Sequence, residues 1–125
     1  MDEEIEWPRE IKVIEELDES QKGEYKGISW GPDNIDKIDT CHWNAMIIID
    51  KSHIYVFSII MKTTYPKYPP EFYLTNTKTS VKGIKKSGLV DVDYYDSLKN
   101  WKSASCIKDV LLEIKCSLTK GHRKH

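Results

Sequence analysis

Apolar residues follow a helical spacing near the start of the chain. Between residues 8 and 20, Val13, Ile14 and Leu17 share one arc of about 100° on a helical wheel, whereas Ile11 lies roughly 60° beyond its edge. A proline suits the first turn, and a glycine soon after the segment offers a stop. We therefore predict a helix from about residue 8 to 20. Ile11 has two interpretations: it flanks the core, or it is kept for contact with another protein.

A second helical pattern lies close to the end of the chain. It is expected to begin at Ser105 or Cys106 and to end at Gly121, and residues 121–125 would then form a mobile tail. Its apolar positions recur at spacings typical of one helix face, which gives a continuous apolar stripe. The stripe consists of Ile107, Val110, Leu111, Ile114 and Leu118.

Between these helices, the sequence has the character of short β-strands. Three runs are rich in β-branched and aromatic residues and are separated by Gly, Pro, Asn and Asp. Their short connections favour an antiparallel meander. The three runs cover residues 24–30, 38–50 and 52–62, and a fourth short strand is expected at residues 71–75.

The third run is apolar on both of its faces. By alternation, the even positions from Ile54 to Ile60 share one face and the odd positions from Tyr55 to Met61 share the other. The predicted helices can cover only one face of so small a sheet, so the other face is expected to expose an apolar patch. The alternative is that a terminal segment covers it. The patch would consist of Met46, Ile48, Ile54 and Val56.

A proline-rich connection, TTYPKYPPEFYL, leads to the fourth strand. Because proline fixes φ and lacks an N–H donor, Pro66, Pro69 and Pro70 should end the preceding ladder. We expect an extended, polyproline-like turn with Tyr65 and Tyr68 packed over it. The same pattern is found in ligands of proline-binding modules, but its position between two apolar strands favours a structural role.

Composition narrows the classes of function. The 125 residues fit one domain, residues 1–125, and a net charge of -1 gives no reason to expect a nucleic acid or an anionic membrane as partner. The three cysteines fit neither a disulfide framework nor a zinc site, which favours a reducing compartment. The acidic first residues are not a signal peptide, and no run is long enough to span a bilayer. We expect a cytosolic or nuclear protein without a cofactor.

A long polar region separates the fourth strand from the last helix. Residues 76–101 show no clear periodicity, and loops of this length inside a domain are usually functional. The region contains Asp91, Asp93 and Asp96, which lack the glycine and glutamate spacing of a calcium loop. We interpret this acidic cluster as solvated and expect no metal site.

In this order, the predicted elements resemble the ubiquitin-conjugating fold from Pro8 to Lys120. Several stretches are similar, more specifically, to the ubiquitin-conjugating enzyme variants, the UEV family: PREIKVIEELDESQKG, ISWG, HWNAMII, HIYVFSI, GLVDVD and LKNWKSASCIKDVLLEI. The resemblance implies an α+β fold with an N-terminal helix, a four-stranded antiparallel meander sheet, a long loop and a C-terminal helix. It also implies that the last helices of catalytic members are missing.

Catalytic members of this fold carry a His-Pro-Asn element and, a few residues after a glycine, a nucleophilic cysteine. The corresponding segment, TSVKGIKKSGLVDVD, has no His, Pro or Cys, and aligning Gly88 with the family glycine places Asp91 near the nucleophile's position. A carboxylate cannot replace a thiolate in thioester exchange. Cys106 is the only alternative nucleophile, although a role in capping the helix is the simpler interpretation. We interpret Cys41 and Cys116 as packing residues. The resemblance therefore implies a non-catalytic protein.

The resemblance also implies two protein-binding surfaces. UEV proteins pair with a catalytic ubiquitin-conjugating enzyme and hold an acceptor ubiquitin, so that chains of the lysine-sixty-three type form. The partner enzyme would contact Trp7, Pro8, Arg9 and Ile11, and Ile11 replaces the family's phenylalanine. The acceptor ubiquitin would contact Ser29, Met46, Ile48, Ile54 and Val56. The hairpin IIDKSHI is shorter than the family's loop.

Three hypotheses about function follow. The first is the non-catalytic subunit of a ubiquitin-conjugating heterodimer, which accounts for both surfaces and for the missing nucleophile. The second is a ubiquitin- or peptide-binding adaptor of the same fold without a catalytic partner. The third is an active conjugating enzyme with a displaced cysteine.

Overall fold

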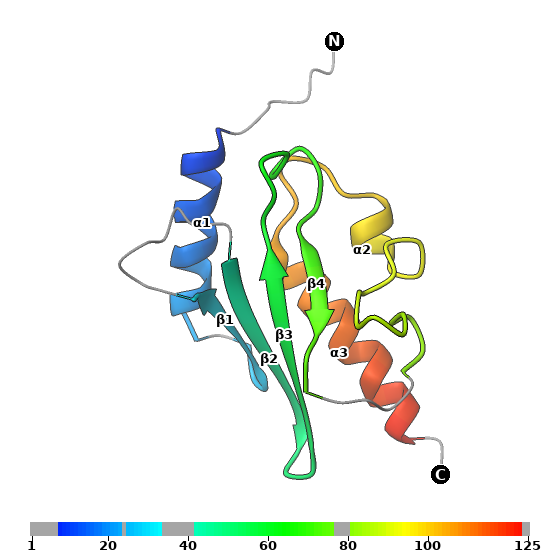
Figure 1. The fold of residues 1–125 in the computed structure, drawn as a ribbon. Helices are drawn as coiled ribbons and strands as arrows, with labels where there is room; N and C mark the ends of the chain where they lie inside the picture. Colours follow the sequence, from blue (N-terminus) through cyan, green and yellow to red (C-terminus); the bar gives the residue numbers. More distant parts are fainter. Residues whose placement is uncertain (1–7, 24, 34–41, 77–80, 124–125) are drawn as a thin grey trace.

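One antiparallel sheet packs against helices on one of its faces in the computed structural model, which describes residues 8–23, 25–33, 42–76 and 81–123 (Figure 1). The strands lie in the order β1-β2-β3-β4, and every neighbouring pair is antiparallel. The predicted α+β architecture with a four-stranded meander is confirmed. The elements are α1 (Arg9–Gln21), β1 (Ile28–Pro32), β2 (His42–Asp50), β3 (His53–Ile60), β4 (Glu71–Leu74), α2 (Asp96–Lys99) and α3 (Ile107–Arg123).

The first strand begins later than predicted. Gly27 has a φ of +77°, and a Cβ added there would lie 2.8 Å from the carbonyl oxygen of Ile48. Both the backbone conformation and the lack of space require glycine, so the residues before it form a turn and the ladder starts at Ile28. The second strand begins at His42, and the predicted residues 38–41 lie outside the described part of the chain.

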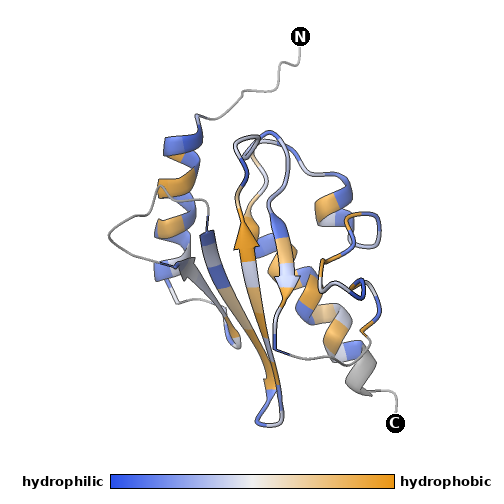
Figure 2. Cartoon of the chain, viewed as in Figure 1, coloured by the Kyte–Doolittle hydropathy of each residue, from blue (hydrophilic) through white to orange (hydrophobic). Residues whose placement is uncertain are grey.

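Alternation along the strands separates a covered face of the sheet from an exposed one. Phe57, Ile59 and Met61 are fully buried under the helices, whereas Ile54 on the opposite face is exposed. The hydrophobic positions of β3 and α3 stand out in Figure 2. The predicted division of the third run into two faces is therefore confirmed. The buried face is joined to both long helices in one core cluster that includes Val13, Trp30, Trp43, Ile47, Phe57, Phe72, Leu111 and Ile114.

The last helix agrees with its predicted pattern but not with its predicted end. All five residues of the apolar stripe are buried, from Ile107 to Leu118. The helix continues through Gly121 to Arg123, so the predicted stop at Gly121 is wrong. Glycine ends a helix when it adopts a positive φ, but it can also continue the helix at a modest cost.

The first helix lies where the sequence predicts it, and Val13 and Leu17 of the predicted arc face the core, but the buried face is rotated away from Ile14. The buried residues of α1 are Lys12, Val13 and Glu16, while Ile14 is 57% exposed. The prediction that Ile14 belongs to the core is therefore wrong. The reason lies in a polar contact between α1 and α3, which is described below.

The proline-rich connection is rigid but not extended. Tyr65 N–H donates to the Lys62 carbonyl at 2.9 Å, and Tyr68 N–H donates to the Thr64 carbonyl at 3.0 Å, so the segment folds into successive turns. The predicted polyproline-like geometry is wrong. Tyr65 is buried as predicted, beside the ring of Trp101, but Tyr68 is 55% exposed and does not pack over the turn.

The long polar region contributes to the core. Single bridges join Tyr73 to Leu89 and Ile84 to Val90, and the short helix α2 packs against α3. The segment buries Val90, Tyr95 and Leu98. These apolar residues are too widely spaced to give a periodic signal, which is why the sequence did not reveal this structure.

Candidate functional site

The exposed face of the sheet carries the predicted apolar patch. Met46, Ile48 and Ile54 are 37%, 41% and 39% exposed. Cross-strand pairing places Met46 opposite both Ser29 and Val56, and Ile48 opposite Ile54. These five residues, which we call the sheet patch, therefore form one continuous surface. No described segment covers it, and binding by the patch stays a prediction.

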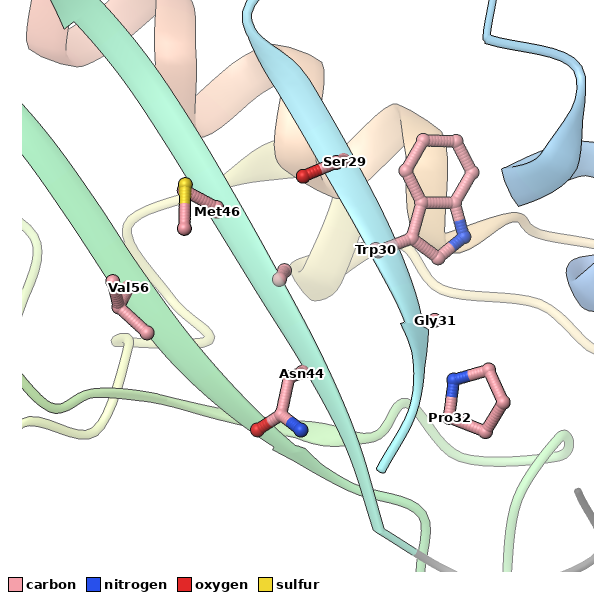
Figure 3. A pocket seen from close by; sticks show the side chains of 8 residues that line it. Ser29, Trp30, Gly31, Pro32, Asn44, Met46 and Val56 are labelled. Atoms are coloured by element: carbon pink, nitrogen blue, oxygen red, sulfur yellow. The ribbon is translucent and has the colours of Figure 1, made fainter. Parts of the chain in front are cut away.

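A hollow over β1 and β2 overlaps the sheet patch, since Ser29, Met46 and Val56 of the patch line it (Figure 3). It has a volume of about 310 Å³ and opens to solvent. Asn44 at its edge donates from Nδ2 to the Asp33 carboxylate at 2.8 Å. The sequence analysis did not predict the hollow. Gly31, a residue without a side chain on the exposed face, could have indicated it. The lining consists of Ser29, Trp30, Gly31, Pro32, Asn44, Ala45, Met46 and Val56.

A side-chain amide holds the edge of β3 beneath the sheet patch. Pairing between β3 and β4 ends at Phe57 and Leu74, so the first half of β3 has no neighbouring strand on that side. Asn76 replaces it: its Oδ1 accepts the Val56 N–H at 2.9 Å and its Nδ2 donates to the Ile54 carbonyl at 2.8 Å. The edge groups are thereby satisfied without another strand, and the backbone that carries the patch is held in place.

The predicted partner-binding residues begin with Trp7, which lies outside the described residues. Pro8 is exposed directly before α1. Arg9 is used inside the chain: its guanidinium donates to the carbonyl oxygens of Met61 at 3.0 Å and Lys62 at 2.7 Å, and it lies over the Tyr65 ring. Arg9 therefore fastens the start of α1 to the proline-rich turn.

The outer face of α1 combines apolar and acidic side chains. Ile11 is 51% exposed and therefore lies on the surface rather than at the edge of the core. Ile14 lies one turn further along and is also exposed. The exposed acids Glu10, Glu15 and Asp18 surround them. Because the two basic residues before Lys22, Arg9 and Lys12, turn inward, this face is apolar and acidic. The outer face of α1 consists of Glu10, Ile11, Ile14, Glu15 and Asp18.

A buried carboxylate joins α1 to α3. Glu16 is 1% exposed, and its Oε2 accepts the N–H of Ile107, the first residue of α3, at 2.9 Å. The Tyr65 hydroxyl donates to the same oxygen at 3.4 Å, and the Lys12 ammonium lies 4.0 Å away. The other oxygen, Oε1, has no hydrogen-bond partner among the described residues. Since the free N–H groups at a helix N-terminus favour an acceptor of negative charge, the contact explains why α1 buries Glu16.

Lys12 is a buried cation beside Glu16. Its Nζ donates to Glu15 at 2.7 Å and to the Ala104 carbonyl at 3.3 Å, and lies 3.7 Å from the sulfur of Cys106. Burial lowers the pKa of Lys12, but the contacts with Glu15 and Glu16 outweigh it and leave the pKa raised. We call Lys12, Glu16 and Tyr65 the buried polar joint.

Burial dominates the acid–base behaviour of the joint. It raises the pKa of Glu16 from 4.5 to about 7, and the Ile107 N–H and Lys12 oppose the shift only in part. Burial also raises the pKa of Tyr65. Sequence reasoning missed this cluster because Lys12 and Glu16 look like ordinary surface charges on a helix.

Asp91, which the resemblance aligns with the family nucleophile, lies in a structured turn. Asp91 N–H donates to the Gly83 carbonyl at 2.9 Å, and the Asp91 carboxylate accepts the Asp93 N–H at 2.9 Å. Cys106 lies instead where the chain enters α3, and burial raises the pKa of its thiol. The raised pKa disfavours a nucleophilic role for Cys106, whereas the predicted capping role stays a prediction, since the Ile107 N–H is accepted by Glu16. Cys116 is exposed on α3, so its interpretation as a packing residue is wrong, and Cys41 lies outside the described residues.

The described residues show neither a cluster of metal ligands nor a membrane-spanning helix. No group of three or more His, Cys, Asp or Glu side chains there is placed to hold a metal ion. Among the same residues, no helix is both long and apolar enough to cross a membrane.

The chain matches one protein family and is similar to several known proteins. The family profile described as "Ubiquitin-conjugating enzyme" matches residues 12–125. Ubiquitin-conjugating enzyme E2 variant 1D of Arabidopsis thaliana is 26% identical over 123 residues, covering 94% of this chain and 84% of that protein. Ubiquitin-conjugating enzyme spm2 of Schizosaccharomyces pombe is 30% identical over 115 residues (86% and 82%). Ubiquitin-conjugating enzyme variant MMS2 of Saccharomyces cerevisiae is 27% identical over 114 residues (86% and 82%).

A solved structure has the same fold. The structure of human ubiquitin-conjugating enzyme E2 G1 superposes with a TM-score of 0.73, covering 86% of this chain and 92% of that one. The two chains are 16% identical, so the likeness concerns the fold alone.

Proposed function

The chain belongs to the ubiquitin-conjugating enzyme family, and we propose that it acts there as a non-catalytic variant. It pairs with a catalytic ubiquitin-conjugating enzyme and positions an acceptor ubiquitin for synthesis of chains of the lysine-sixty-three type. Its place of action is the cytoplasm, the nucleus or both. Two of the similar proteins, 1D and MMS2, are named as ubiquitin-conjugating enzyme variants, which supports the assignment as a variant.

The sheet patch is the observation that carries the proposal. A sheet face with three exposed large hydrophobic residues in adjacent positions, Met46, Ile48 and Ile54, is a surface suited to another protein. Such a patch complements the hydrophobic face of ubiquitin. The amide of Asn76 holds the strand beneath it, so the patch is preorganised for binding.

The missing nucleophile supports the non-catalytic role. The sequence has no cysteine between residues 42 and 105, and the position aligned with the family nucleophile is Asp91. An aspartyl anhydride with ubiquitin would be hydrolysed rather than transferred. The chain would therefore contribute by orientation: holding an acceptor lysine against the partner's thioester can be worth about 7–11 kcal/mol of the barrier at best.

The start of α1 supports pairing with a catalytic enzyme. Ile11 projects from the outer face of α1, and Arg9 fixes this end of the helix to the turn at Lys62. An exposed aliphatic side chain on a fixed helix is suited to insertion into a pocket of a partner. Pro8 and Trp7 would flank it.

A reconstituted reaction tests the proposal. The chain is incubated with activating enzyme, ATP and ubiquitin, with or without a chain-forming conjugating enzyme. We expect no reducible ubiquitin adduct on the chain alone and chain synthesis only with the partner. Ile54→Asp should abolish chain synthesis while pairing is retained, and Ile11→Asp should abolish both. A reducible adduct on the chain alone would overturn the proposal, and would be mapped by Cys106→Ser.

A second function is favoured by one observation. Ile11 is smaller than the phenylalanine expected at this position, so the contact with a catalytic partner would be weaker. A ubiquitin- or peptide-binding adaptor without a catalytic partner would not need that contact. Ubiquitin binding by the sheet patch, combined with no measurable pairing in calorimetric titration against conjugating enzymes, would favour the adaptor.

A further inference from the structure

The rotation of α1 is fixed by titratable side chains on its inner side. The outer face of α1 carries Ile11 and Ile14, and the buried polar joint lies on the opposite side of the same helix. Glu16 joins that side to α3, because its Oε2 accepts the Ile107 N–H at 2.9 Å. Tyr65 joins it to the proline-rich turn, since its hydroxyl donates to the same oxygen at 3.4 Å. The presentation of the outer face therefore depends on one buried carboxyl group.

The carboxyl group of Glu16 has no cation within hydrogen-bond distance among the described residues. Its Oε2 lies 4.0 Å from Nζ of Lys12, and its Oε1 has no hydrogen-bond partner in the same part of the chain. Nζ of Lys12 instead contacts the Glu15 carboxylate at 2.7 Å. A carboxyl group that is buried without a close cation is more stable with its proton. Burial accordingly raises the pKa of Glu16 to about 7, so the proton is exchanged near neutral pH.

Three segments contribute the other charged or titratable groups around Glu16. Burial raises the pKa of both Tyr65 and Cys106, so these two groups stay neutral near pH 7. Burial opposes the charge of Lys12, but its acidic neighbours leave its pKa raised, so Lys12 stays charged. Glu16 is therefore the member of the joint that changes charge near neutral pH. The surrounding groups are Arg9, Lys12 and Glu15 from α1, Tyr65 from the turn, and Cys106 and Asp109 at the start of α3.

Lys12 connects the charge of Glu16 to the outer face of α1. Its Nζ reaches two carboxyl groups, at 2.7 Å from Glu15 on the outer face and at 4.0 Å from Glu16 inside. When Glu16 loses its proton, the new negative charge attracts Lys12 inward and away from Glu15. Glu15 lies about one helical turn from Ile11, so a carboxylate without its cation then lies beside the apolar contact. Removing such a charge from water opposes the binding of another protein.

We propose that Glu16 is a positioning residue for pairing with the catalytic enzyme, and that release of its proton weakens this pairing. The inference rests on the proposed function and adds to it a regulation by pH. Glu16 itself is buried and acts through Lys12 and through the contact of α1 with α3. Because pairing favours the protonated form, linkage requires that pairing in turn takes up a proton. The chain then pairs more tightly in slightly acidic than in slightly alkaline solution.

Calorimetric titration of the full chain with a chain-forming conjugating enzyme tests this coupling. Between pH 6 and pH 8, the affinity of the wild type should fall by about tenfold relative to that of Glu16→Gln, because only the protonated fraction of the wild type pairs. The comparison cancels the titration of the partner enzyme itself. At pH 8, buffers of different ionisation enthalpy should reveal that the wild type takes up about one proton more than the variant on pairing.

A further measurement needs no substitution in the joint. The titration of the Glu16 side chain is followed by NMR of isotope-labelled glutamate in the free chain and in the complex, and pairing should raise its midpoint. Thermal unfolding at both pH values verifies that the wild type and Glu16→Gln are folded. The matched control is Asp93→Asn, which removes an exposed carboxylate between β4 and α2 and should keep the wild-type affinity and pH profile.

Three results would overturn this inference and leave the proposed function intact. They are parallel pH profiles for the wild type and Glu16→Gln, an unchanged Glu16 midpoint on pairing, and a change of profile in Asp93→Asn as large as that in Glu16→Gln. Absence of pairing by the wild type at every pH would overturn the proposed function and this inference together.

Discussion

The two long helices cover the same face of the sheet but distribute their residues in opposite ways. In α3, the five apolar residues of the predicted stripe are buried. In α1, Val13 is buried, but Ile11 and Ile14 are exposed and Lys12 and Glu16 are buried instead. The contrast teaches that apolar periodicity identifies the buried face only when the polar residues of a helix have no partner inside the protein.

The partner in α1 is the N-terminus of α3. Isolated burial of Glu16 would be costly, and the Ile107 N–H and the nearby Lys12 offset only part of that cost. Rotating α1 to bury the joint turns Ile11 and Ile14 toward solvent. The buried charges of α1 and its exposed hydrophobic residues are therefore two consequences of one rotation.

The largest expected effect compares isoleucines on the two helices. Ile114→Ala in α3 should lower the free energy of unfolding by about 2–5 kcal/mol, because it leaves a cavity in the core. Ile14→Ala in α1 should change it by less than about 0.5 kcal/mol, because the side chain is exposed. Denaturant unfolding of both variants provides the measurement. An equal loss in the two variants would contradict the orientation of α1.

The pH dependence of stability tests the buried polar joint. The pKa of Glu16 is raised to about 7, so the folded state keeps a proton that the unfolded state, with a pKa of 4.5, releases. Its contribution to stability is fully present below pH 4.5 and is lost as the pH rises through about 7. The loss should amount to roughly 3 kcal/mol at most.

Glu16→Gln removes this titration while keeping an acceptor for the Ile107 N–H. Unfolding measured at several pH values should show the wild type losing stability relative to the variant across that window. Parallel pH profiles for the two proteins would show that Glu16 does not titrate as its burial implies.

For the affinity of a catalytic partner enzyme, unlike for stability, substitutions in α1 should have a larger effect than a substitution in α3. Within the proposed function, Ile11→Ala and Ile14→Ala should each weaken the affinity for the partner by about tenfold, since each removes an exposed apolar contact. The matched control is Leu112→Ala, which removes an apolar side chain of similar exposure on α3 and should change the affinity by less than about twofold. Calorimetric titration provides the affinities. An equal loss in the control would show that pairing does not use the outer face of α1.

The smallest expected effect concerns Glu113 of α3, whose pKa is shifted in the opposite direction to that of Glu16. Glu113 accepts hydrogen bonds from the backbone N–H groups of Asp96 and Ser97 and from the Ser97 hydroxyl, and so caps α2. Burial alone would raise the pKa of Glu113, but these hydrogen bonds outweigh it and lower the pKa. Its contribution is present above the unfolded pKa and is lost as the pH falls through the lower, folded value.

Glu113→Gln should cost about 0.5–1 kcal/mol at neutral pH, because the capping contact is partly screened by solvent. The cost should shrink in acid, where wild-type Glu113 is protonated. Unfolding of both proteins at neutral and acidic pH measures it. A cost that grows in acid would contradict the capping role.

Much of the fold could be predicted from the sequence. Alternation along β3 identified the covered and exposed faces, because the strand period of two leaves only one assignment for Ile54 and Val56. Helical spacing identified α3 for the same kind of local reason. The boundaries were less accurate: Gly27 and Gly121 look alike in the sequence, but only the contact with Ile48 forces a turn at Gly27.

The candidate site was predicted less completely. The sheet patch followed from alternation together with the resemblance, but the internal role of Arg9 and the hollow at Gly31 did not. Both depend on neighbours distant in the chain, the turn at Met61 and Lys62 for Arg9 and the opposite strand at Asn44 for the hollow. A local pattern contains no information about such neighbours.

The sequence by itself determined the two long helices and the four strands, which residues of β3 share a face, and that no cysteine lies between residues 42 and 105. Those properties depend on residue type and on spacing along the chain. Only the tertiary structure decided how α1 is rotated, because that rotation depends on Glu16 meeting the free N–H of Ile107, 91 residues away. The exposure of Ile11 and Ile14 follows from that single long-range contact rather than from their own spacing.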